Sequence, residues 1–316
     1  MRQRDIDVPD HVRKKVAVLG AEGVQWLSDL PELVGEMEQA WQITVGATLE
    51  GGSEAYVARA RTSEGAPVVL KVPIPEREGN TGLVRAIAAL AVADGRGYVR
   101  LLRSDLSRRA LLLEALGMPL SDTGYSTSAQ IEIICAALKE SWMPVAPGSS
   151  LLSGAISGPW FSQFIPNLWE KLGRPCSQRA VDLALSYAQS RASAFDPDTS
   201  VLVHGDAHNR NMLQNLSPTP QSPASFKFID PDGLITEKAY DLGVLMREWT
   251  DELIPDPVRL GRERCAYLSQ LTGVEAQAIW QWGFIQSMAT GLFLTQVGQE
   301  QAGRQMLDVA EAWSSA

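Results

Sequence analysis

Cysteine and histidine are scarce in this sequence. Its 316 residues include three of each. Cys135, Cys176 and Cys265 lie far apart, form no CxxC pair, and have no histidine at the spacing of a metal ligand. We therefore expect reduced structural thiols and no metal site built from cysteine and histidine.

Basic residues are in deficit, with 28 Lys and Arg against 37 Asp and Glu and a net charge of −9. This balance argues against a nucleic-acid or anionic-membrane partner, both of which call for a basic surface. An acidic surface would tolerate a cationic ligand. Nothing in the sequence indicates an obligate protein partner.

Long apolar runs are also missing. No stretch reaches the roughly 18 apolar residues of a membrane-spanning helix, and the charged start Met1–Asp7 leads into no signal-peptide-like apolar segment. The sequence therefore predicts a cytoplasmic protein. With 45% hydrophobic residues, the chain can bury the core of one large domain or of two packed lobes.

The first part of the chain is rich in expected strands. In the first forty residues, apolar positions recur at helical spacing, with an interruption expected at Pro31; these positions are Val24, Leu27, Leu30, Leu33, Val34 and Met37. One helix is expected at Leu83–Val92. The strands expected from alternating or β-branched runs are Trp41–Leu49, Ala55–Thr62, Val68–Val72, Tyr98–Leu102 and Ala110–Glu114.

After Leu116 the periodicity becomes mainly helical. The expected helices are Thr127–Ser141, Phe161–Leu172, Ser177–Phe195, Asp241–Leu253, Pro257–Thr272, Glu275–Val297 and Glu300–Trp313. Short strands are expected at Val201–His204 and Phe226–Ile229, with Met212–Gln214 as a candidate third. The fold class is thus α+β, with an N-terminal lobe over residues 1–116 and a helical lobe over residues 117–316.

Two apolar strands end in polar residues that suit phosphoryl transfer. Val201–Val203 leads into a loop with Asp206 and Asn211, and Phe226–Ile229 leads into Asp230. If the two strands lie side by side, these three residues meet in one cleft. Phosphoryl transfer needs oxygen ligands for Mg²⁺, a carboxylate facing the attacking hydroxyl, and a cation over the phosphates. Lys71, on an apolar strand, is the candidate cation.

These residues carry a family resemblance. His204-Gly205-Asp206 with Asn211, then Ile229-Asp230, and Lys71 upstream resemble the H-G-D-x-x-x-x-N and I-D motifs of the aminoglycoside phosphotransferases, relatives of the protein kinases. Gly95–Leu102, Leu111–Glu114 and Ile229–Pro231 resemble the streptomycin phosphotransferase branch, also described as aminoglycoside/hydroxyurea resistance kinases. The resemblance implies a protein-kinase-like fold whose N-terminal lobe is a five-stranded antiparallel sheet with a helix.

The resemblance also implies roles for individual residues. Asp206 would be the catalytic base, Asn211 and Asp230 would hold Mg²⁺, and Lys71 would bind the α- and β-phosphates of ATP. His204 and Asp241 would support the catalytic loop. Backbone or side-chain groups would contact the nucleotide at Gly52 and Ser53, in the phosphate-covering loop, and at Glu114 and Leu116, beside adenine.

Other positions keep two interpretations. His208 would contact the γ-phosphate or cap the loop, and Asp232 would bind a second metal or the substrate or serve the turn. Glu248 and Asp251 belong to an acidic segment that suits a cationic substrate or forms a solvated helix face.

The lysine–glutamate pair of kinases has no obvious counterpart. The expected helix Leu83–Val92 contains no acid, which leaves Glu78 or Glu76 as the candidate partner of Lys71.

The function expected is ATP- and Mg²⁺-dependent transfer to a hydroxyl of a small molecule, with a streptomycin-type aminoglycoside favoured as acceptor. A kinase of a sugar, an amino alcohol, hydroxyurea or another antibiotic is the main alternative, followed by a catalytically silent nucleotide-binding protein. A metallophosphoesterase would need more histidines than the chain has, and a lone Asp-x-Asp at Asp230–Asp232 is weak support for a glycosyltransferase. The sequence leaves open ATP against GTP preference and the oligomeric state.

Overall fold

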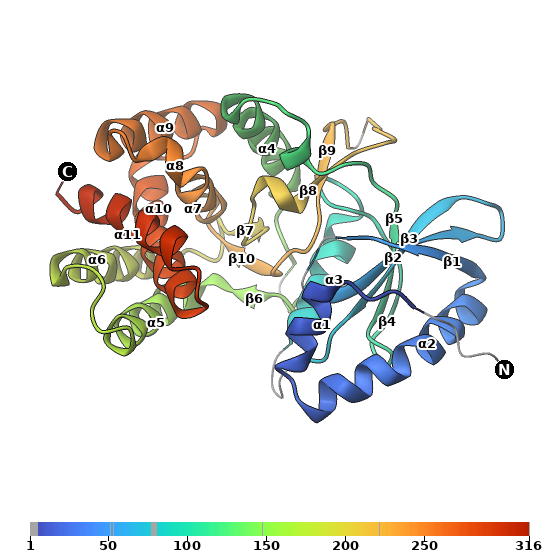
Figure 1. The fold of residues 1–316 in the computed structure, drawn as a ribbon. Helices are drawn as coiled ribbons and strands as arrows, with labels where there is room; N and C mark the ends of the chain where they lie inside the picture. Colours follow the sequence, from blue (N-terminus) through green and yellow to red (C-terminus); the bar gives the residue numbers. More distant parts are fainter. Residues whose placement is uncertain are drawn as a thin grey trace.

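The chain folds into two lobes that lie side by side, as the computed structural model shows (Figure 1). The structure describes residues 6–50, 52, 54–76, 81–146, 148–220 and 222–315. The N-terminal lobe is built on a sheet, and the C-terminal lobe is mainly helical. The predicted α+β two-lobe fold is confirmed.

The N-terminal sheet has five antiparallel strands in the order β1-β2-β3-β5-β4. Their bounds are Ile43–Thr48 (β1), Ala55–Thr62 (β2), Pro67–Pro73 (β3), Leu101–Asp105 (β4) and Ala110–Glu114 (β5). The prediction placed the fourth strand at Tyr98–Leu102, a few residues too early. Tyr98 instead forms an isolated bridge with Phe228 of the other lobe, outside the β4–β5 hairpin.

Two N-terminal helices, α1 (Asp10–Ala17) and α2 (Ala21–Trp41), pack on this sheet and share its apolar core. The expected interruption at Pro31 is wrong, since α2 continues through it. Burial of Leu30 and Val34 on either side stabilises the helix despite the hydrogen bond that proline cannot make. Val24, expected on the packed face, is exposed, and Trp26 is buried instead.

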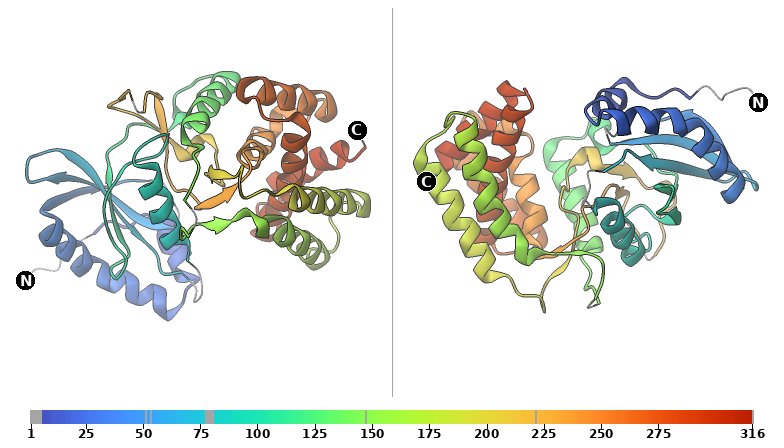
Figure 2. Two further views of the ribbon diagram at one scale, coloured as in Figure 1. Left: turned by 180° about the vertical axis from the view of Figure 1, so that it is seen from behind. Right: turned by 90° about the horizontal axis from the view of Figure 1, so that it is seen from below.

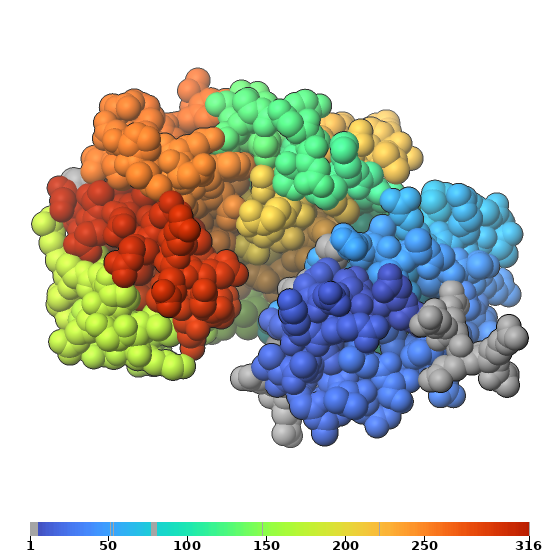
Figure 3. Space-filling view, viewed as in Figure 1, coloured from blue at the N-terminus to red at the C-terminus, as the bar shows by residue number. Residues whose placement is uncertain are grey.

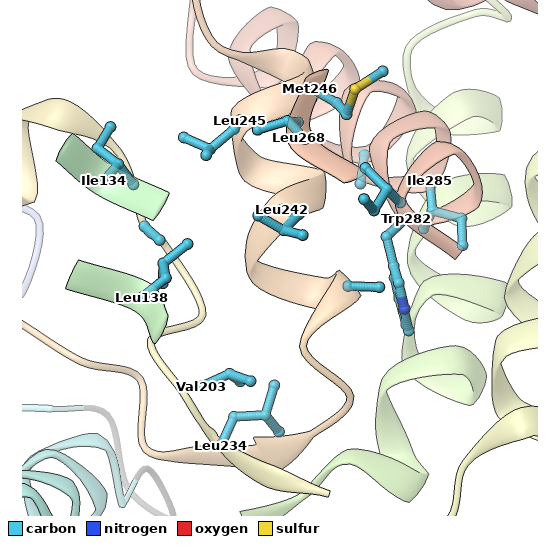
Figure 4. Packing of buried hydrophobic residues seen from close by; sticks show 14 of the residues in the cluster. Ile134, Leu138, Val203, Leu234, Leu242, Leu245, Met246, Leu268, Trp282 and Ile285 are labelled. Carbon is cyan, nitrogen blue, oxygen red and sulfur yellow. The ribbon is translucent and has the colours of Figure 1, made fainter. Parts of the chain in front are cut away.

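The C-terminal lobe is a helical assembly around α10, against which α7 packs. Its helices are α4 (Thr127–Ser141), α5 (Ser157–Lys171), α6 (Gln178–Ala194), α7 (Ala239–Arg247), α8 (Thr250–Leu253), α9 (Pro257–Thr272), α10 (Ala276–Gln296) and α11 (Glu300–Trp313). Figure 2 shows α5, α6, α10 and α11 gathered at the end away from the sheet. Leu242, Leu245 and Met246 of α7 lie among buried side chains of the neighbouring helices (Figure 4). This packing fixes α7 in the lobe.

The single helix expected at Asp241–Leu253 is divided in two. α7 ends at Arg247, and α8 begins at Thr250. Trp249 lies between them in the left-handed region, with a φ of 50°, and this conformation breaks the helix. The break turns the segment around Glu248 and Trp249 out of the helical path.

Five short strands flank the polar loops of the C-terminal lobe. They are β6 (Leu152–Ser153), β7 (Val201–Val203), β8 (Met212–Gln214), β9 (Phe226–Phe228) and β10 (Leu234–Thr236). β7 and β9 do not lie side by side, because β7 pairs with β10 and β9 pairs with β8. β8 and β9 are the two arms of one hairpin, and the turn after β9 sends the chain back along β7 as β10.

Within the described residues, no helix is both long and apolar enough to cross a membrane. The three cysteines are unpaired. Burial raises the pKa of Cys265 to about 11, so its thiol is protonated at neutral pH.

Candidate active site

The candidate residues gather where the chain leaves β7 and β9. His204–Asn211 follow β7, and Asp230–Gly233 follow β9. The Asp232 N–H donates to the His204 carbonyl at 2.9 Å, and the Ile229 N–H donates to the Asn211 carbonyl at 2.9 Å. The two loops are therefore joined by backbone hydrogen bonds, although β7 and β9 are not neighbours.

A glycine permits this close approach. Gly205 has a φ of +93°, and a Cβ at that position would collide with the Asp232 side chain. Glycine is therefore needed both for its backbone conformation and for its lack of a side chain. This explains the Gly in the His-Gly-Asp sequence.

Asp241 holds the loop after β7 through hydrogen bonds to the backbone of that loop. Its carboxylate accepts hydrogen bonds from the backbone N–H groups of His204 (3.0 Å) and Gly205 (2.8 Å) and from the indole of Trp142 (2.9 Å). Asp241 is fully buried. Burial raises its pKa, and the neighbouring His204 opposes the rise. The start of α7 is thus tied to the start of the loop.

His204 joins the two loops through its ring. Its Nδ1 accepts from the Asp206 N–H at 3.1 Å, so Nε2 carries the proton and donates to the Ile229 carbonyl at 2.7 Å. Burial lowers the pKa of this imidazole, with Asp241 opposing. A neutral, buried ring has a bracing role, and it also stacks on Tyr98.

Asp206 projects from the loop with both carboxylate oxygens engaged. Arg247 donates to Oδ1 at 2.6 Å, and His208 Nε2 lies 3.2 Å from Oδ2. Desolvation alone would raise the pKa of Asp206, but the His208 hydrogen bond and the Arg247 charge together hold it well below its usual range. The side chain is still 40% exposed, so a ligand can reach the carboxylate.

Sequence reasoning missed Arg247. It stands in an acidic segment, and its partner lies 41 positions earlier in the chain. Only the fold brings the end of α7 to the loop. No local pattern carries that information.

His208 makes a contact that fits loop capping. Its Nδ1 accepts from the Asn211 N–H at 3.2 Å, at the start of a short 3₁₀ turn over Asn209–Asn211. The same ring faces Asp206 through Nε2. Of the two interpretations of His208, capping has this direct contact.

Asn211 and Asp230 lie on the two joined loops. The Asn211 amide donates to the Asp206 carbonyl at 3.1 Å, which orients its side chain. Asp230 adopts a left-handed φ of 59°, an unusual conformation for a residue other than glycine and one that recurs at functional sites. The Lys71 ammonium contacts the Asp230 carboxylate. The structure therefore brings Lys71 from β3 to the same place as the two loops.

The sequence left Glu78 or Glu76 as the candidate partner of Lys71. Glu78 lies outside the described residues. Glu76 accepts from the Leu83 N–H at 3.1 Å, at the start of α3 (Gly82–Ala93), and pairs with Arg109 at 3.4 Å. The pairing partner of Lys71 is instead Asp230.

Helix α3 presents an arginine rather than an acid to the second loop. The Arg85 guanidinium donates to the Asp232 carbonyl at 3.3 Å. Gly233, with a φ of +69°, lies so close that an added Cβ would be 2.6 Å from the Arg85 carbonyl oxygen. This close packing joins the N-terminal lobe to the turn that carries Asp230.

Asp232 differs from its neighbours in protonation. Its side chain keeps contact with solvent, but surrounding protein atoms displace part of its water. This desolvation, followed by the negative charge of Asp206, raises the pKa of Asp232 to about 7. Its backbone serves the turn, and its carboxylate lies against Gly205.

Of the two acidic candidates further along, only Glu248 lies beside the loop. Its side chain is 10% exposed and pairs with Arg210 at 3.3 Å and Arg247 at 3.8 Å. Asp251 is solvent-exposed on α8.

The candidate nucleotide-binding positions of the N-terminal lobe are arranged as follows. Ser53 lies outside the described residues. The Gly52 carbonyl accepts from His11 Nε2 of α1 at 3.1 Å, and Lys15 of the same helix pairs with Glu54 at 2.8 Å. The N-terminal helix α1 therefore contacts both sides of the expected phosphate-covering loop.

Glu114 ends β5 and uses its side chain within the protein. Its carboxylate accepts from the Arg100 N–H at 2.7 Å and from the buried Lys227 ammonium at 2.6 Å. Leu116, two residues on, is half-buried at the passage between the lobes. On the face drawn in Figure 3, the surface is hollowed between the blue N-terminal elements and the red α11, with yellow to orange atoms of the segment around residues 200–235 within the hollow.

The comparison with known proteins decides the family. The model of the aminoglycoside/hydroxyurea antibiotic resistance kinases matches residues 40–298. The chain belongs to this family. It is therefore a phosphotransferase of the aminoglycoside phosphotransferase group, and the predicted relationship and enzyme class are confirmed.

Individual resistance kinases match along most of their length. The chain is 24% identical to a streptomycin 6-kinase from Streptomyces glaucescens over 311 residues, which is 97% of each chain. It is 27% identical to a hydroxyurea phosphotransferase from Kitasatospora aureofaciens, over 83% of this chain and 76% of that protein.

The fold recurs in the choline kinase LicA from Streptococcus pneumoniae. The two are 15% identical, the match covers 89% of this chain and 97% of the other, and the TM-score is 0.56. LicA has also been determined in complex with AMP. At this identity the likeness establishes the two-lobe fold, and it carries no conclusion about the substrate.

Proposed function

We propose that this protein transfers the γ-phosphoryl group of ATP to a hydroxyl of a small molecule, with Mg²⁺ as cofactor. The main support is the convergence of Asp206, Asn211 and Asp230 on two hydrogen-bonded loops, with Lys71 in contact with Asp230. These are the residue types that phosphoryl transfer requires. Because the reaction uses ATP, we place the protein in the cytoplasm.

The donor set suits Mg²⁺. Asn211 and Asp230 offer an amide and a carboxylate oxygen, which are hard ligands, and Mg²⁺ is commonly bound by one or two such groups together with substrate phosphates. Within the described part of the chain, no group of three or more His, Cys, Asp or Glu side chains is placed to hold a metal. When bound, Mg²⁺ would neutralise charge on the transferred phosphate.

The protein side chains divide the remaining roles. Asp206 orients the acceptor hydroxyl and receives its proton, while Lys71 binds the phosphates. Arg247 and His208 fix the carboxylate of Asp206, and His204 and Asp241 hold the loop in place. Most catalysis in this reaction class comes from positioning and electrostatics, so a strongly acidic but well-oriented Asp206 is adequate.

The nucleotide would lie between the lobes. Gly52 and Ser53 would cover the phosphates, and the backbone at Glu114–Leu116 would contact adenine. His208 and Asp232 stand next to the reacting groups and are further candidates, for the γ-phosphate and for a second metal or the substrate.

The first acceptor to test is a streptomycin-type aminoglycoside. The support is the streptomycin 6-kinase, which matches over nearly the whole chain. Hydroxyurea follows from the second relative, and sugars and amino alcohols are further alternatives. A catalytically silent nucleotide-binding protein is the competing non-enzymatic function.

Coupled ADP release from Mg-ATP tests the proposal with a panel of acceptors, namely streptomycin, other aminoglycosides, hydroxyurea, simple sugars and amino alcohols. We expect acceptor-dependent release, with streptomycin as the best substrate. If no acceptor stimulates release while nucleotide still binds, the result favours the silent protein and contradicts the acceptors named here.

A further inference from the structure

A cavity adjoins Asp206 in the C-terminal lobe. Its volume is about 470 Å³, and its lining comes from the α7–α8 junction, from α10 and α11, and from the loop after β7. Arg247 lines this cavity and also donates to Asp206 at 2.6 Å. Arg247 therefore connects the cavity lining to the carboxylate of Asp206.

Glu248 is the acidic residue in the cavity lining. Its side chain is only 10% exposed, and a carboxylate so far removed from water needs a cation beside it. Two arginines serve this purpose, and they differ in how firmly they are held.

Arg247 is fixed elsewhere. Its guanidinium is 13% exposed, lies 2.6 Å from Asp206, and is 3.8 Å from Glu248 at the nearest approach. It therefore belongs mainly to the Asp206 pair and supports Glu248 only weakly.

Arg210 is the replaceable partner. It also lines the cavity and lies 3.3 Å from Glu248, but its side chain is 62% exposed. An ion pair with one such exposed member is screened by water and readily exchanged. The remaining lining is neutral and includes Trp249, Thr290 and Gln299, which suits a polar molecule with hydroxyl groups.

We propose that Arg210 occupies the place of a cationic group of the acceptor, and that a guanidinium or ammonium group of the acceptor displaces it and binds Glu248. Glu248 is then the residue that selects a cationic acceptor, and Arg247 keeps Asp206 oriented during the exchange. This inference rests on the proposed phosphotransferase function and names the acceptor class for the cavity.

The experiment compares two probes by isothermal titration calorimetry in the presence of Mg-AMP-PNP. Streptomycin carries two guanidino groups on a six-membered cyclitol ring, and myo-inositol is a neutral cyclitol. The variants are Glu248→Gln and Arg210→Ala, with Glu263→Gln as control, since Glu263 is an exposed carboxylate that pairs with Arg259 on α9.

We expect the wild type to bind streptomycin more tightly than myo-inositol. Glu248→Gln should weaken streptomycin binding by at least about tenfold, because it removes one partner of a nearly buried charge pair. Arg210→Ala should strengthen it about two- to fivefold by removing the competitor. Myo-inositol binding, AMP-PNP binding and the control variant should change by less than about twofold.

Three results would overturn the inference: no streptomycin binding to the wild type, unchanged affinity in Glu248→Gln, or weaker affinity in Arg210→Ala. The Arg210 variant keeps the test decisive if Glu248→Gln is unstable. ADP release with a neutral acceptor, independent of Glu248, would leave the phosphotransferase proposal standing and refute the cation exchange alone. Absence of Mg-nucleotide binding would instead refute the proposed function itself.

Discussion

At the scale of single residues, the site is governed by carboxylates in different surroundings. Asp241 is buried and satisfied by backbone and indole donors, Asp206 is held by Arg247 and His208, and Asp230 contacts Lys71. These environments suit three different roles, which are bracing the loop, orienting a hydroxyl and binding a metal. In the proposed mechanism, the same residue type would serve three purposes because its neighbours differ.

Asp241 should be important for stability. Asp241→Ala leaves three donors without their partner, the N–H groups of His204 and Gly205 and the Trp142 indole. We expect a loss of at least about 3 kcal/mol, since each buried unpaired donor costs about 1–3 kcal/mol. Urea unfolding followed by tryptophan fluorescence measures this loss. Asp251→Ala, at an exposed carboxylate, should change stability by less than about 0.5 kcal/mol, and equal effects of the two variants would contradict this role.

The sequence predicted the loops that carry the site residues. It did not predict the contacts between residues far apart in the chain. The His-Gly-Asp and Ile-Asp motifs predicted loops at strand ends, and the structure places Asp206, Asn211 and Asp230 on such loops. The contacts of Arg247 with Asp206 and of Lys227 with Glu114 join residues 41 and 113 positions apart. The sequence around Arg247 or Lys227 does not indicate such a distant partner.

At the scale of elements, the contact between α3 and the turn after Asp230 leaves no room for a side chain at Gly233. Arg85 donates to the Asp232 carbonyl, and Gly233 lies directly against the backbone of Arg85. Kinases use a glutamate on this helix, whereas here the helix contributes an arginine that reaches the turn after Asp230, the proposed metal ligand.

Gly233→Ala should disturb this join. Gly233 and Gly273 both have positive φ angles, of +69° and +74°, but an added Cβ meets the Arg85 backbone only at Gly233 and open space at Gly273. Gly273→Ala should therefore cost only the backbone strain, about 1–2 kcal/mol. Gly233→Ala should lose about 1–3 kcal/mol more from the clash. The midpoints of urea unfolding compare the stability of the two variants. Equal losses of stability would refute a tight contact between Gly233 and Arg85.

Several element bounds followed directly from the periodicity of the sequence, whereas α5 begins at Ser157, four residues before its predicted start. Helices α4, α9 and α11 begin and end at the predicted residues, and so do strands β2, β5 and β8. The predictions failed where tertiary packing outweighed a local signal, as at Pro31 inside α2 and at the left-handed Trp249 that divides α7 from α8. The pairing of β7 with β10 also required the fold, because β10 is only three residues long.

At the scale of the whole molecule, two apolar cores meet at the N-terminal sheet. One core joins α1 and α2 to the sheet, and the other runs from Leu111 and Leu113 of β5 through α3 into the C-terminal lobe. A nucleotide bound by Lys71 on one side and Asp230 on the other would connect the lobes. Ligand binding should therefore stabilise the protein as a unit.

Mg-AMP-PNP should raise the melting temperature. At about 100 times its Kd, a ligand specific for the folded state contributes about 2.7 kcal/mol, which should shift the melting temperature by several degrees. EDTA should remove most of the shift, and Asp230→Ala should abolish the Mg²⁺-dependent part. Differential scanning fluorimetry provides the measurement, and a shift insensitive to both treatments would contradict metal binding by Asp230.

The central claim is that Asp206 acts on the acceptor and takes no part in holding the nucleotide. The most direct measurement compares wild type and Asp206→Ala for Mg-AMP-PNP affinity and for acceptor-dependent ADP release in the same preparation. We predict an AMP-PNP Kd within about threefold of wild type and turnover lowered by at least about a thousandfold. Turnover near the wild-type level, or loss of nucleotide binding, would contradict the claim.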